Sequence, residues 1–469
     1  MSKASKRLSP LGAVGIALGL VGAFVGHSAS AQDVAITGVT VATGDGSEPV
    51  ENGAVLIRGG RVVYAGPASG MPASGGATAI DGQGAWVTPG IVAAITTLGL
   101  LDVGGVGESN DSSARNSPFS AALDVAPAVN PNSQHILVHR AAGVTRAATT
   151  TSPSASIFAG QGAIIDLGAD PDAVMRPRAF QMVALGEQGG RIAGGSRVAA
   201  HVLFRNALRE AMKLGEDARI PGRSSARPET DFGDDVPVDP RLSGEYAERA
   251  GDVLLTRFDA SALVPVVRGE QLLLVAVERA SDIRSVLALK KEFPRLDMAL
   301  VGASEGWLVA QNIAAAGVPV IADGLDDLPE NFEELASTQS NIGRMVQAGV
   351  TVAINASAME NPRNLNQYAG NLVALGRVPG AAGLSWGQAL AAITSVPARI
   401  LGIDGRAGTL AQGAAGDLVV WDGDPLEVGS TPVKVFIDGV EQPLENHQSR
   451  LRDRYRDLDT NDLPKGYDW

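Results

Sequence analysis

Residues 87–101 read VTPGIVAAITTLGLL, and the pattern of the chain changes within this stretch. Before it, residues 33–66 are rich in β-branched side chains, and Gly59-Gly60 separates two short apolar runs as in a two-residue hairpin. After Pro89, short apolar runs alternate with amphipathic stretches such as residues 195–214. We therefore expect a β-rich segment to end near Pro89 and a series of strands and helices to begin there.

The alternating part of the chain predicts an α/β fold, a TIM-like (β/α)8 barrel over residues 89–396. Short apolar strands that alternate with helices are typical of parallel units buried on both faces, and about eight such units close a barrel. Ser385 and Gln388 have the spacing of a capping box that opens a late helix. Strand patterns return after that helix, so we expect a composite β-sandwich domain built from residues 32–88 and 397–444.

The first 31 residues have the pattern of a secretory signal peptide. Lys3, Lys6 and Arg7 precede a glycine-rich apolar stretch, which leads into Ala29-Ser30-Ala31. A membrane anchor is the weaker alternative, because the apolar stretch is short. We therefore expect an exported protein, in the periplasm, that begins at Gln32 after cleavage.

The composition excludes some classes of function. Without the three basic residues of the leader, the formal net charge changes from −13 to −16, which argues against nucleic acid as a partner. After the leader no segment is long and apolar enough to span a bilayer, and the absence of cysteine means that a large core replaces disulfides. Residues 221–246 indicate a surface insertion, and residues 445–469 a charged C-terminal tail.

Several stretches of the chain resemble signature stretches of the amidohydrolase superfamily, in the expected order. They include IRGGRVVYAG at 57–66, IDGQGAWVTPGIV at 80–92 and RASDI at 279–283. The most specific is ARILGIDGRAGTLAQGAAGDLVVWDGDP at 398–425. The chain is similar to imidazolonepropionase-like and related exported members. The resemblance implies the barrel and the small β-sandwich, and hydrolysis of C–N bonds in small amides, lactams or dipeptide-like compounds with a divalent metal such as zinc.

The metal ligands of the family do not carry over to this sequence. The places of two paired histidines, two single histidines and one aspartate are taken here by Ile95, Thr97, Ala276, Val301 and Ser357. A bridging lysine early in the barrel is also excluded, because the first lysine after the leader is Lys213. Zinc needs about four N, O or S ligands. We therefore expect no metal cofactor, and a hydrophobic cavity at the carboxyl ends of the strands, bordered by Ile95, Ala276 and Val301.

The remaining histidines offer little metal chemistry. His135 and His139 share one helix face at i, i+4 spacing and could bind a metal, but no further ligand lies in that stretch. The alternative is an exposed helix outside the barrel. His201 is expected in an amphipathic helix, and His447 in the solvated tail.

Polar residues follow several predicted strands, at the face where barrel enzymes work. Glu278, Glu305 and Asp323 are candidates for acid–base chemistry without metal. Asn355 and Ser357 end the eighth strand. The alternative is structural: Glu278 pairs with Arg279 or another base, while the other two carboxylates cap loops or helices.

Three functions stay open at this point. The first is an amidohydrolase-family protein without its metal centre, a pseudoenzyme that forms a hetero-oligomer with a catalytically intact relative, held in part by the tail from Glu445. The second is an active periplasmic hydrolase of C–N bonds with a relocated or metal-free site. The third is a periplasmic small-molecule binder that uses the old pocket.

Overall fold

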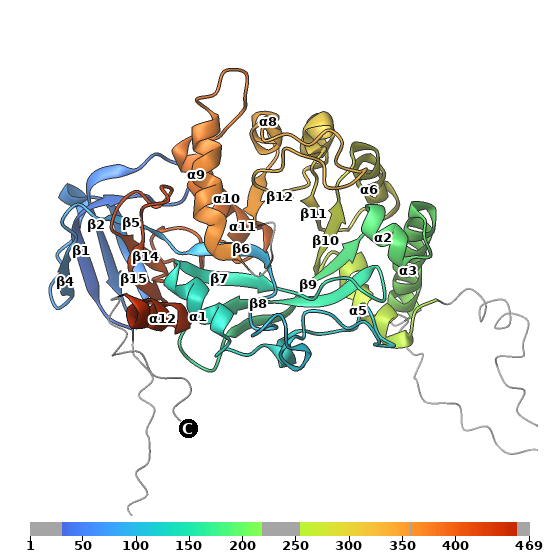
Figure 1. Ribbon diagram of the computed structural model, residues 1–469, viewed down its shortest axis with the longest axis horizontal. Coiled ribbons are helices and arrows are strands. Elements are labelled where there is room, and N and C mark those ends of the chain that lie inside the picture. The colour runs from blue at the N-terminus through green and yellow to red at the C-terminus, as the bar shows by residue number, and fades with distance from the viewer. Residues whose placement is uncertain (1–30, 218–253, 357–358, 360, 457–469) are drawn as a thin grey trace, which may run out of the picture. The chain divides into compact units, whose positions relative to one another are not determined.

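The computed structural model describes residues 31–217, 254–356, 359 and 361–456, and it contains two eight-stranded sheets (Figure 1). The predicted signal peptide, apart from Ala31, and the predicted insertion at 221–246 lie outside the described residues. In the part of the chain that is described, no helix is both long and apolar enough to cross a membrane.

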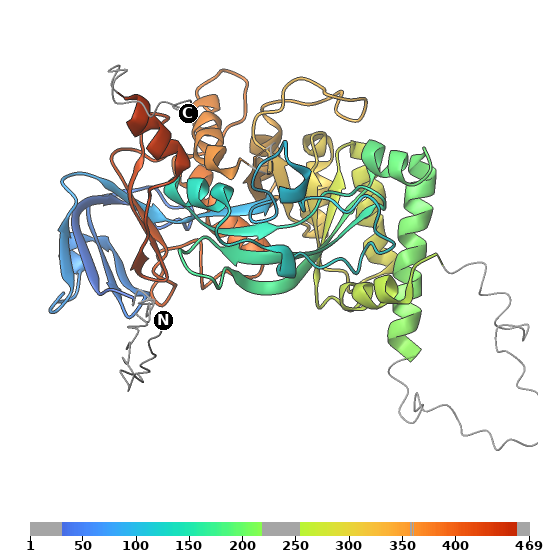
Figure 2. The ribbon, with the colours of Figure 1, turned by 60° about the horizontal axis from the view of Figure 1, so that its bottom comes forward.

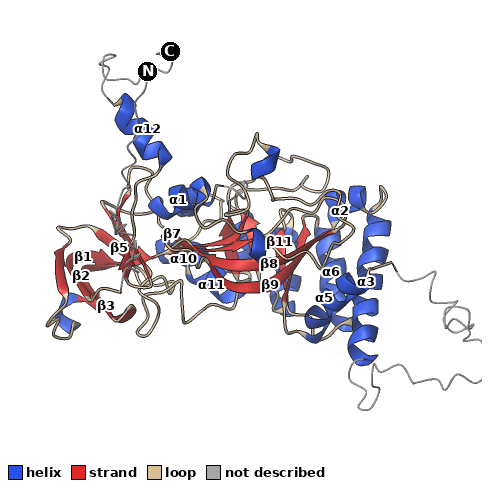
Figure 3. Ribbon diagram, turned by 90° about the horizontal axis from the view of Figure 1, so that it is seen from below, coloured by secondary structure: helices blue, strands red, loops and turns tan. Residues whose placement is uncertain are grey.

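The first sheet combines strands from both ends of the chain, as predicted. Its strands are β1 (Val34–Val41), β2 (Val50–Arg58), β3 (Arg61–Pro67), β4 (Thr78–Asp81), β5 (Trp86–Pro89), β14 (Leu418–Trp421), β15 (Pro432–Ile437) and β16 (Val440–Glu441). They run in the order β16-β15-β14-β5-β1-β2-β3, with β4 also paired to β1. The two halves meet where β5 pairs antiparallel with β14. Figure 3 shows these strands as one group.

The predicted hairpin at Gly59-Gly60 is confirmed. Arg58 faces Arg61 across the turn, and both glycines have positive φ angles, 54° and 77°. Two consecutive left-handed residues give a turn whose twist matches that of the flanking strands, and glycine adopts this conformation without steric cost.

The second sheet forms the predicted TIM-like barrel. Its strands are β6 (Ile91–Thr96), β7 (Val144–Thr149), β8 (Phe158–Asp166), β9 (Val174–Ala184), β10 (Leu272–Val277), β11 (Met298–Gly302), β12 (Val320–Asp323) and β13 (Val352–Asn355), each beside the next in sequence. One strand departs from the (β/α)8 pattern, because β8 runs antiparallel to β7 and to β9. Parallel strands need a crossover of about a dozen residues or more, and the links at 150–157 and 167–173 are too short for one.

Most of the described helices pack around the barrel, whereas α12 packs against α1. The described helices are α1 (Gln134–Ala141), α2 (Gly186–Ile192), α3 (Arg197–Asp217), α5 (Arg257–Arg268), α6 (Ala280–Glu292), α7 (Ala310–Ala316), α8 (Asn341–Gln347), α9 (Leu365–Leu375), α10 (Trp386–Ile393), α11 (Ser395–Ile400) and α12 (His447–Tyr455). Figure 2 shows α3 and α5 side by side. The capping box of Ser385 and Gln388 opens α10 as predicted.

Alternation along the strands separates two apolar layers. In β10, Leu273, Val275 and Val277 belong to the outer layer, which also contains Ile283 of α6. The neighbouring positions, among them Leu274 and Ala276, belong to a second cluster inside the barrel, which we call the interior cluster. The interior cluster also includes residues from other strands, among them Val92, Ala299, Ile321 and Ala353. This periodicity decides which side chains reach the barrel axis.

A buried ion cluster joins the barrel to the composite sheet. Arg146 of β7 has no exposed side-chain surface, and its Nε and Nη2 donate to the two carboxylate oxygens of Asp417 at 2.6 and 2.8 Å. Asp438 lies 2.9 Å from the same guanidinium, and Asp166 lies 3.6 Å from it. Asp417 directly precedes β14 and Asp438 directly follows β15. The chain ends are therefore fixed to the barrel by charge pairing as well as by apolar packing.

Candidate functional site

The carboxyl ends of β6 and β10–β13 form what we call the barrel mouth, where the predicted site residues gather. Ile95, Ala276 and Val301 all belong to the interior cluster, together with Met359 from the segment after β13. Ile95 is buried, whereas Ala276 and Val301 are partly exposed. The side chains at these positions therefore reach the barrel axis, as the sequence predicted. The hydrophobic cavity that we expected beside them stays a prediction.

Thr97 lies at the same end of the barrel, directly after β6. It is buried, and its backbone N–H donates to the carbonyl oxygen of Met359 at 3.3 Å. Met359 therefore lies against the end of β6. Ser357, the fifth position carried over from the family, lies outside the described residues.

The described side chains at the family's ligand positions do not fit a divalent metal. Ile95, Ala276 and Val301 carry no donor atom, and the hydroxyl of Thr97 is a weak ligand. Among the described residues there is no group of three or more His, Cys, Asp or Glu side chains that could hold a metal ion. The chemistry available at the mouth therefore comes from other side chains.

Glu278 is the first of these side chains, and it follows β10 directly. Its Oε2 accepts a hydrogen bond from the backbone N–H of Ser304 at 2.9 Å and another from the Ser304 hydroxyl at 2.7 Å. The carboxyl packs against Gly302, where an added Cβ would lie only 1.8 Å from Oε1. Burial raises the pKa of Glu278 to about 8, and the nearby negative charge of Asp323 adds to the rise. A carboxyl with this pKa is largely protonated at neutral pH.

Asp323 ends β12, and its side chain accepts a hydrogen bond from the Asn355 amide at 3.1 Å. Asn355 ends β13 and is the register partner of Asp323. Burial raises the pKa of Asp323 to about 7, with further repulsion from Asp326. Two carboxyl groups with raised pKa values on neighbouring parts of the mouth are typical of a binding or catalytic site.

Ser304 is the contact that sequence reasoning missed. It is buried in the loop after β11, behind Gly302 and Ala303, which have positive φ angles of 84° and 52°. A left-handed conformation is uncommon for alanine, and here it belongs to the bend that brings the hydroxyl beneath Glu278. A small-residue run after a strand was the available signal, but the sequence did not show which carboxylate the serine would meet.

Glu305 lies next to Glu278, because its backbone N–H donates to the Glu278 carbonyl oxygen at 3.1 Å, but its side chain has other partners. Its oxygens accept hydrogen bonds from the backbone N–H groups of Ala280 at 3.0 Å and Ala336 at 3.3 Å. Ala280 is the first residue of α6, so Glu305 caps that helix, as the structural alternative predicted. The predicted pairing of Glu278 with Arg279 is wrong, because the partner of Glu278 is Ser304 and Arg279 donates to Ser281 instead.

The two histidines His135 and His139 share one helix, as predicted, but the helix is not fully exposed. His135 and His139 stack on α1 with ring centroids 6.2 Å apart, but His139 is buried, so the expectation of an exposed helix is wrong at this position. The reason is that α1 packs between β7 and the composite sheet. The Nδ1 atom of His139 lies 2.6 Å from the carbonyl oxygen of His135, and burial lowers the pKa of His139 to about 4. His201 is partly exposed and His447 is exposed.

Comparison with known proteins identifies the same family that the sequence resembles. Residues 297–442 match the model of the amidohydrolase family. A relative described as amidohydrolase tasK, from Hapsidospora irregularis, is 26% identical over 413 residues, which cover 80% of this chain and 38% of that protein. Imidazolonepropionase from Acidiphilium cryptum is 51% identical over 49 residues, which cover 10% of this chain and 12% of that protein. The chain thus spans well under half the length of these relatives.

Solved structures agree with the fold. An amidohydrolase from Thermotoga maritima has a TM-score of 0.70 at 22% identity, and the match covers 87% of this chain and 99% of that chain. Molinate hydrolase has a TM-score of 0.51 at 16% identity, over 88% and 95% of the two chains. Identities this low establish the architecture alone. Together with the family match over residues 297–442, they support the similarity of this chain to the amidohydrolase family.

Proposed function

We propose that this protein is a member of the family that has lost the metal-dependent reaction and uses the barrel mouth to bind a small molecule. The observation that carries the proposal is the placement of Ile95, Ala276 and Val301 in the interior cluster. Metal-dependent hydrolysis needs several donor atoms around one ion, and these positions supply apolar surface instead.

The polar groups of the mouth favour a neutral ligand. Protonated Glu278 can donate through its second oxygen, while Asn355 keeps further donor and acceptor capacity beside Asp323. These groups border apolar walls made by Ala276 and Val301. A small apolar molecule with one or two amide or hydroxyl groups matches this combination, because a few convergent polar groups on an apolar surface fix orientation.

Metal analysis of the purified mature protein tests the proposal. We expect well under one equivalent of zinc, manganese or iron after dialysis, and no hydrolysis of small amides or lactams. The matched control is the combined variant Ile95→His, Thr97→His, Ala276→His and Val301→His, checked for folding by circular dichroism. Near-stoichiometric metal in the native protein, bound at the mouth, would contradict the proposal.

A second candidate function is hydrolysis without a metal. The Ser304 hydroxyl lies 2.7 Å from Glu278, which is the distance of a nucleophile hydrogen-bonded to its general base. A base with a pKa near the working pH is efficient, and burial moves the pKa of Glu278 in that direction. If the protein hydrolyses a C–N bond, Ser304→Ala and Glu278→Gln should each abolish turnover, whereas the capping variant Glu305→Gln should retain turnover once its folding is verified.

We also propose that the protein forms a hetero-oligomer with a catalytically intact relative in the periplasm. Two surfaces support a partner: α12, which buries none of its residues, and the loop after β12, which exposes Leu328, Phe332 and Leu335. Co-purification of tagged protein from the envelope fraction is the test. Recovery of the protein alone, with no change in assembly after deletion of residues 445–469, would count against the partner.

A further inference from the structure

A long connection leaves β12 at the barrel mouth. Residues 324–340, which we call the strap, link β12 to α8 and contain no helix or strand. Figure 1 shows this connection reaching from β12 past β11 toward α6. Connections of this length without secondary structure of their own are uncommon in compact domains, and many of them are lids over a binding or catalytic site. The contacts of the strap show which part of the barrel it covers.

Glu333 fixes the far end of the strap. Its Oε2 accepts hydrogen bonds from the backbone N–H of Glu187 at 2.8 Å and from Nη2 of Arg197 at 3.1 Å. Glu187 lies in the first turn of α2, just after β9, and Arg197 begins α3. Gly186 leaves room for the carboxylate, because an added Cβ at that position would clash with Oε2. We call these contacts of Glu333 the latch.

The latch places the strap across the ends of two strands. In the barrel sheet, β11 and β10 lie between β12, where the strap begins, and β9, next to the latch. Further along the strap, the backbone N–H of Ala336 donates to Glu305 at 3.3 Å, and its carbonyl oxygen accepts from the indole N–H of Trp307 at 2.8 Å. Glu305 follows Ser304, the buried partner of Glu278. The strap therefore covers the carboxyl ends of β10 and β11, where polar groups of the mouth lie.

Closure of the strap brings like charges together. The strap has no basic residue and five carboxylates, namely Asp326, Asp327, Glu330, Glu333 and Glu334. Three of them, Asp326, Glu330 and Glu334, add to the raised pKa of Asp323. Glu334 also adds to the raised pKa of Glu278. Since like charges repel, the carboxyl groups of the mouth oppose closure, and the guanidinium of Arg197 beside Glu333 offsets that repulsion.

We infer that the strap is a lid that closes the barrel mouth, and that Glu333 latches it against α2 and α3. The inference rests on the proposed function, because it assigns the strap to the entry of the small molecule that the mouth binds. Opening breaks the contacts of Glu333 and Ala336, while the barrel strands stay paired. Glu333 and Arg197 are positioning residues: they control access to the mouth and do not touch the ligand. Lids of this kind open on a timescale of microseconds to milliseconds.

Thiol labelling of the full mature chain tests the lid, because the sequence contains no cysteine. Ser304→Cys places one thiol beneath the strap, and Ala54→Cys places one in the buried part of the composite sheet. A maleimide reagent should react slowly with both. Adding Glu333→Gln should accelerate labelling of Ser304→Cys about tenfold, since the loss of a hydrogen bond to a charged group shifts the opening equilibrium by about that factor. The rate at Ala54→Cys should not change.

The matched control is Glu292→Gln. Glu292 ends α6 and forms an ion pair of 2.7 Å with Arg209, which lies on the same helix as Arg197. The variant therefore also removes a carboxylate that pairs with α3, but at a distance from the strap. Both labelling rates should stay at their native values in this variant.

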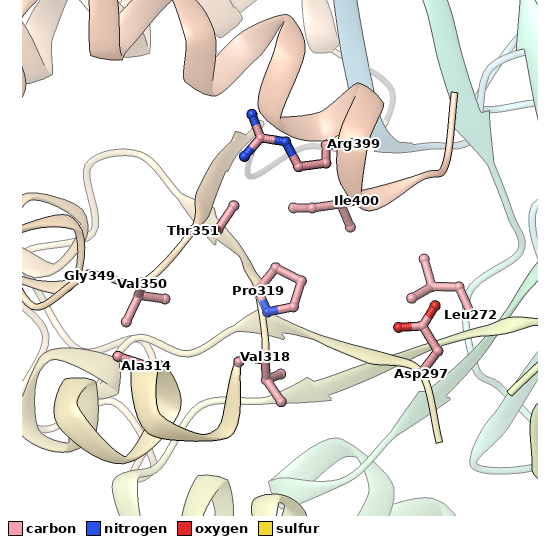
Figure 4. A pocket seen from close by; sticks show the side chains of 11 residues that line it. Leu272, Asp297, Ala314, Val318, Pro319, Gly349, Val350, Thr351, Arg399 and Ile400 are labelled. Carbon is pink, nitrogen blue, oxygen red and sulfur yellow. The ribbon is translucent and has the colours of Figure 1, made fainter. Parts of the chain in front are cut away.

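Hydrogen exchange followed by mass spectrometry gives a second readout that needs no cysteine. The backbone N–H of Ala336 and its neighbours in the strap should exchange about tenfold faster in Glu333→Gln. The opposite ends of the same strands provide an internal reference. Val318 and Pro319 line a separate cavity there, and the strap, which is described throughout, contributes none of its lining residues (Figure 4). Exchange in residues 317–320 should stay unchanged.

Three results would overturn the lid. The first is labelling of Ser304→Cys at the rate of an exposed thiol in the otherwise native protein. The second is an unchanged rate in Glu333→Gln in either measurement. The third is an equal acceleration at Ala54→Cys or in residues 317–320, which would show that Glu333 stabilises the whole fold. If Ser304→Cys does not fold, hydrogen exchange decides alone. Neither measurement uses a metal or a ligand, so failure of the lid is distinguishable from failure of the proposed function.

Discussion

Two regions of the barrel bury charged groups in opposite ways. At the junction with the composite sheet, Arg146 is enclosed by Asp417, Asp438 and Asp166. Burial alone would lower the pKa of Arg146, but Asp417 and its neighbours hold that pKa above the usual value. At the mouth, by contrast, burial raises the pKa of Glu278 and of Asp323, nearby carboxylates add to the rise, and no basic side chain is among the causes.

The difference separates structural charges from candidate functional ones. The buried guanidinium of Arg146 keeps its charge and holds two elements together, although burial raises the pKa of Asp166 at the edge of the cluster to about 6. Buried carboxyl groups without basic partners titrate near neutral pH. Such groups destabilise the fold, and proteins retain them where a binding or catalytic site uses them. The ion cluster at the junction is therefore structural, and the mouth is the candidate functional site.

The largest expected effect comes from removing the charge of Arg146 at the junction with the composite sheet. Arg146→Met should lower the free energy of unfolding by about 3–5 kcal/mol, because it leaves buried carboxylates without their partner. Urea unfolding measures the change. The exposed pair Arg450 and Glu445, 2.8 Å apart, provides the control, since Arg450→Met should change stability by less than about 1 kcal/mol. A loss of stability of similar size in both variants would show that the buried ion cluster at the junction stabilises the protein no more than an exposed ion pair does.

Replacing Glu278, a carboxyl group without a basic partner, should stabilise the protein at alkaline pH. A carboxyl whose pKa is raised on folding keeps its proton in the native state, so stability falls as pH rises from about 4.5 to about 8. Glu278→Gln should remove this component, on the order of 4 kcal/mol at pH 8, since the pKa rises from 4.5 to about 8 and each pKa unit corresponds to about 1.4 kcal/mol.

Thermal unfolding of both proteins at pH 5 and pH 8 measures this difference. Glu305→Gln is the control for the loss of a carboxylate with a capping role, and it should destabilise at both pH values. If Glu278→Gln is as destabilising at pH 8 as at pH 5, the carboxyl is charged and paired in the native protein, contrary to our account.

The fold could be predicted from the sequence, but most of the contacts that distinguish the junction from the mouth could not. The hairpin and the capping box are local signals, and they predicted the turn at Gly59-Gly60 and the start of α10. The reversed direction of β8 was missed because its short links carry no distinct motif. Ser304 and the partners of Arg146 lie far apart in sequence, so only the folded arrangement identifies the contacts.

His139 is a buried basic group that stays neutral. Its pKa falls on folding from 6.5 to about 4, so stability is full above pH 6.5 and is lost as pH falls toward 4. At pH 5 this loss should be about 2 kcal/mol. His139→Gln should show a weaker decline between pH 7 and pH 5, while His447→Gln on the exposed helix should behave like the native protein. Parallel declines in all three would place the acid sensitivity elsewhere.

The smallest expected effect isolates one contact at the mouth. The Ser304 hydroxyl donates to Glu278 and lowers the pKa of that carboxyl, so it stabilises the charged form more than the protonated one. Ser304→Ala should therefore cost about 1 kcal/mol, and more at pH 8 than at pH 5. In the Glu278→Gln background the pH dependence of this cost should vanish, because glutamine does not titrate. A double-mutant cycle at both pH values measures the coupling, and an unchanged pH dependence in the double variant would assign the titration to Asp323 rather than to Glu278.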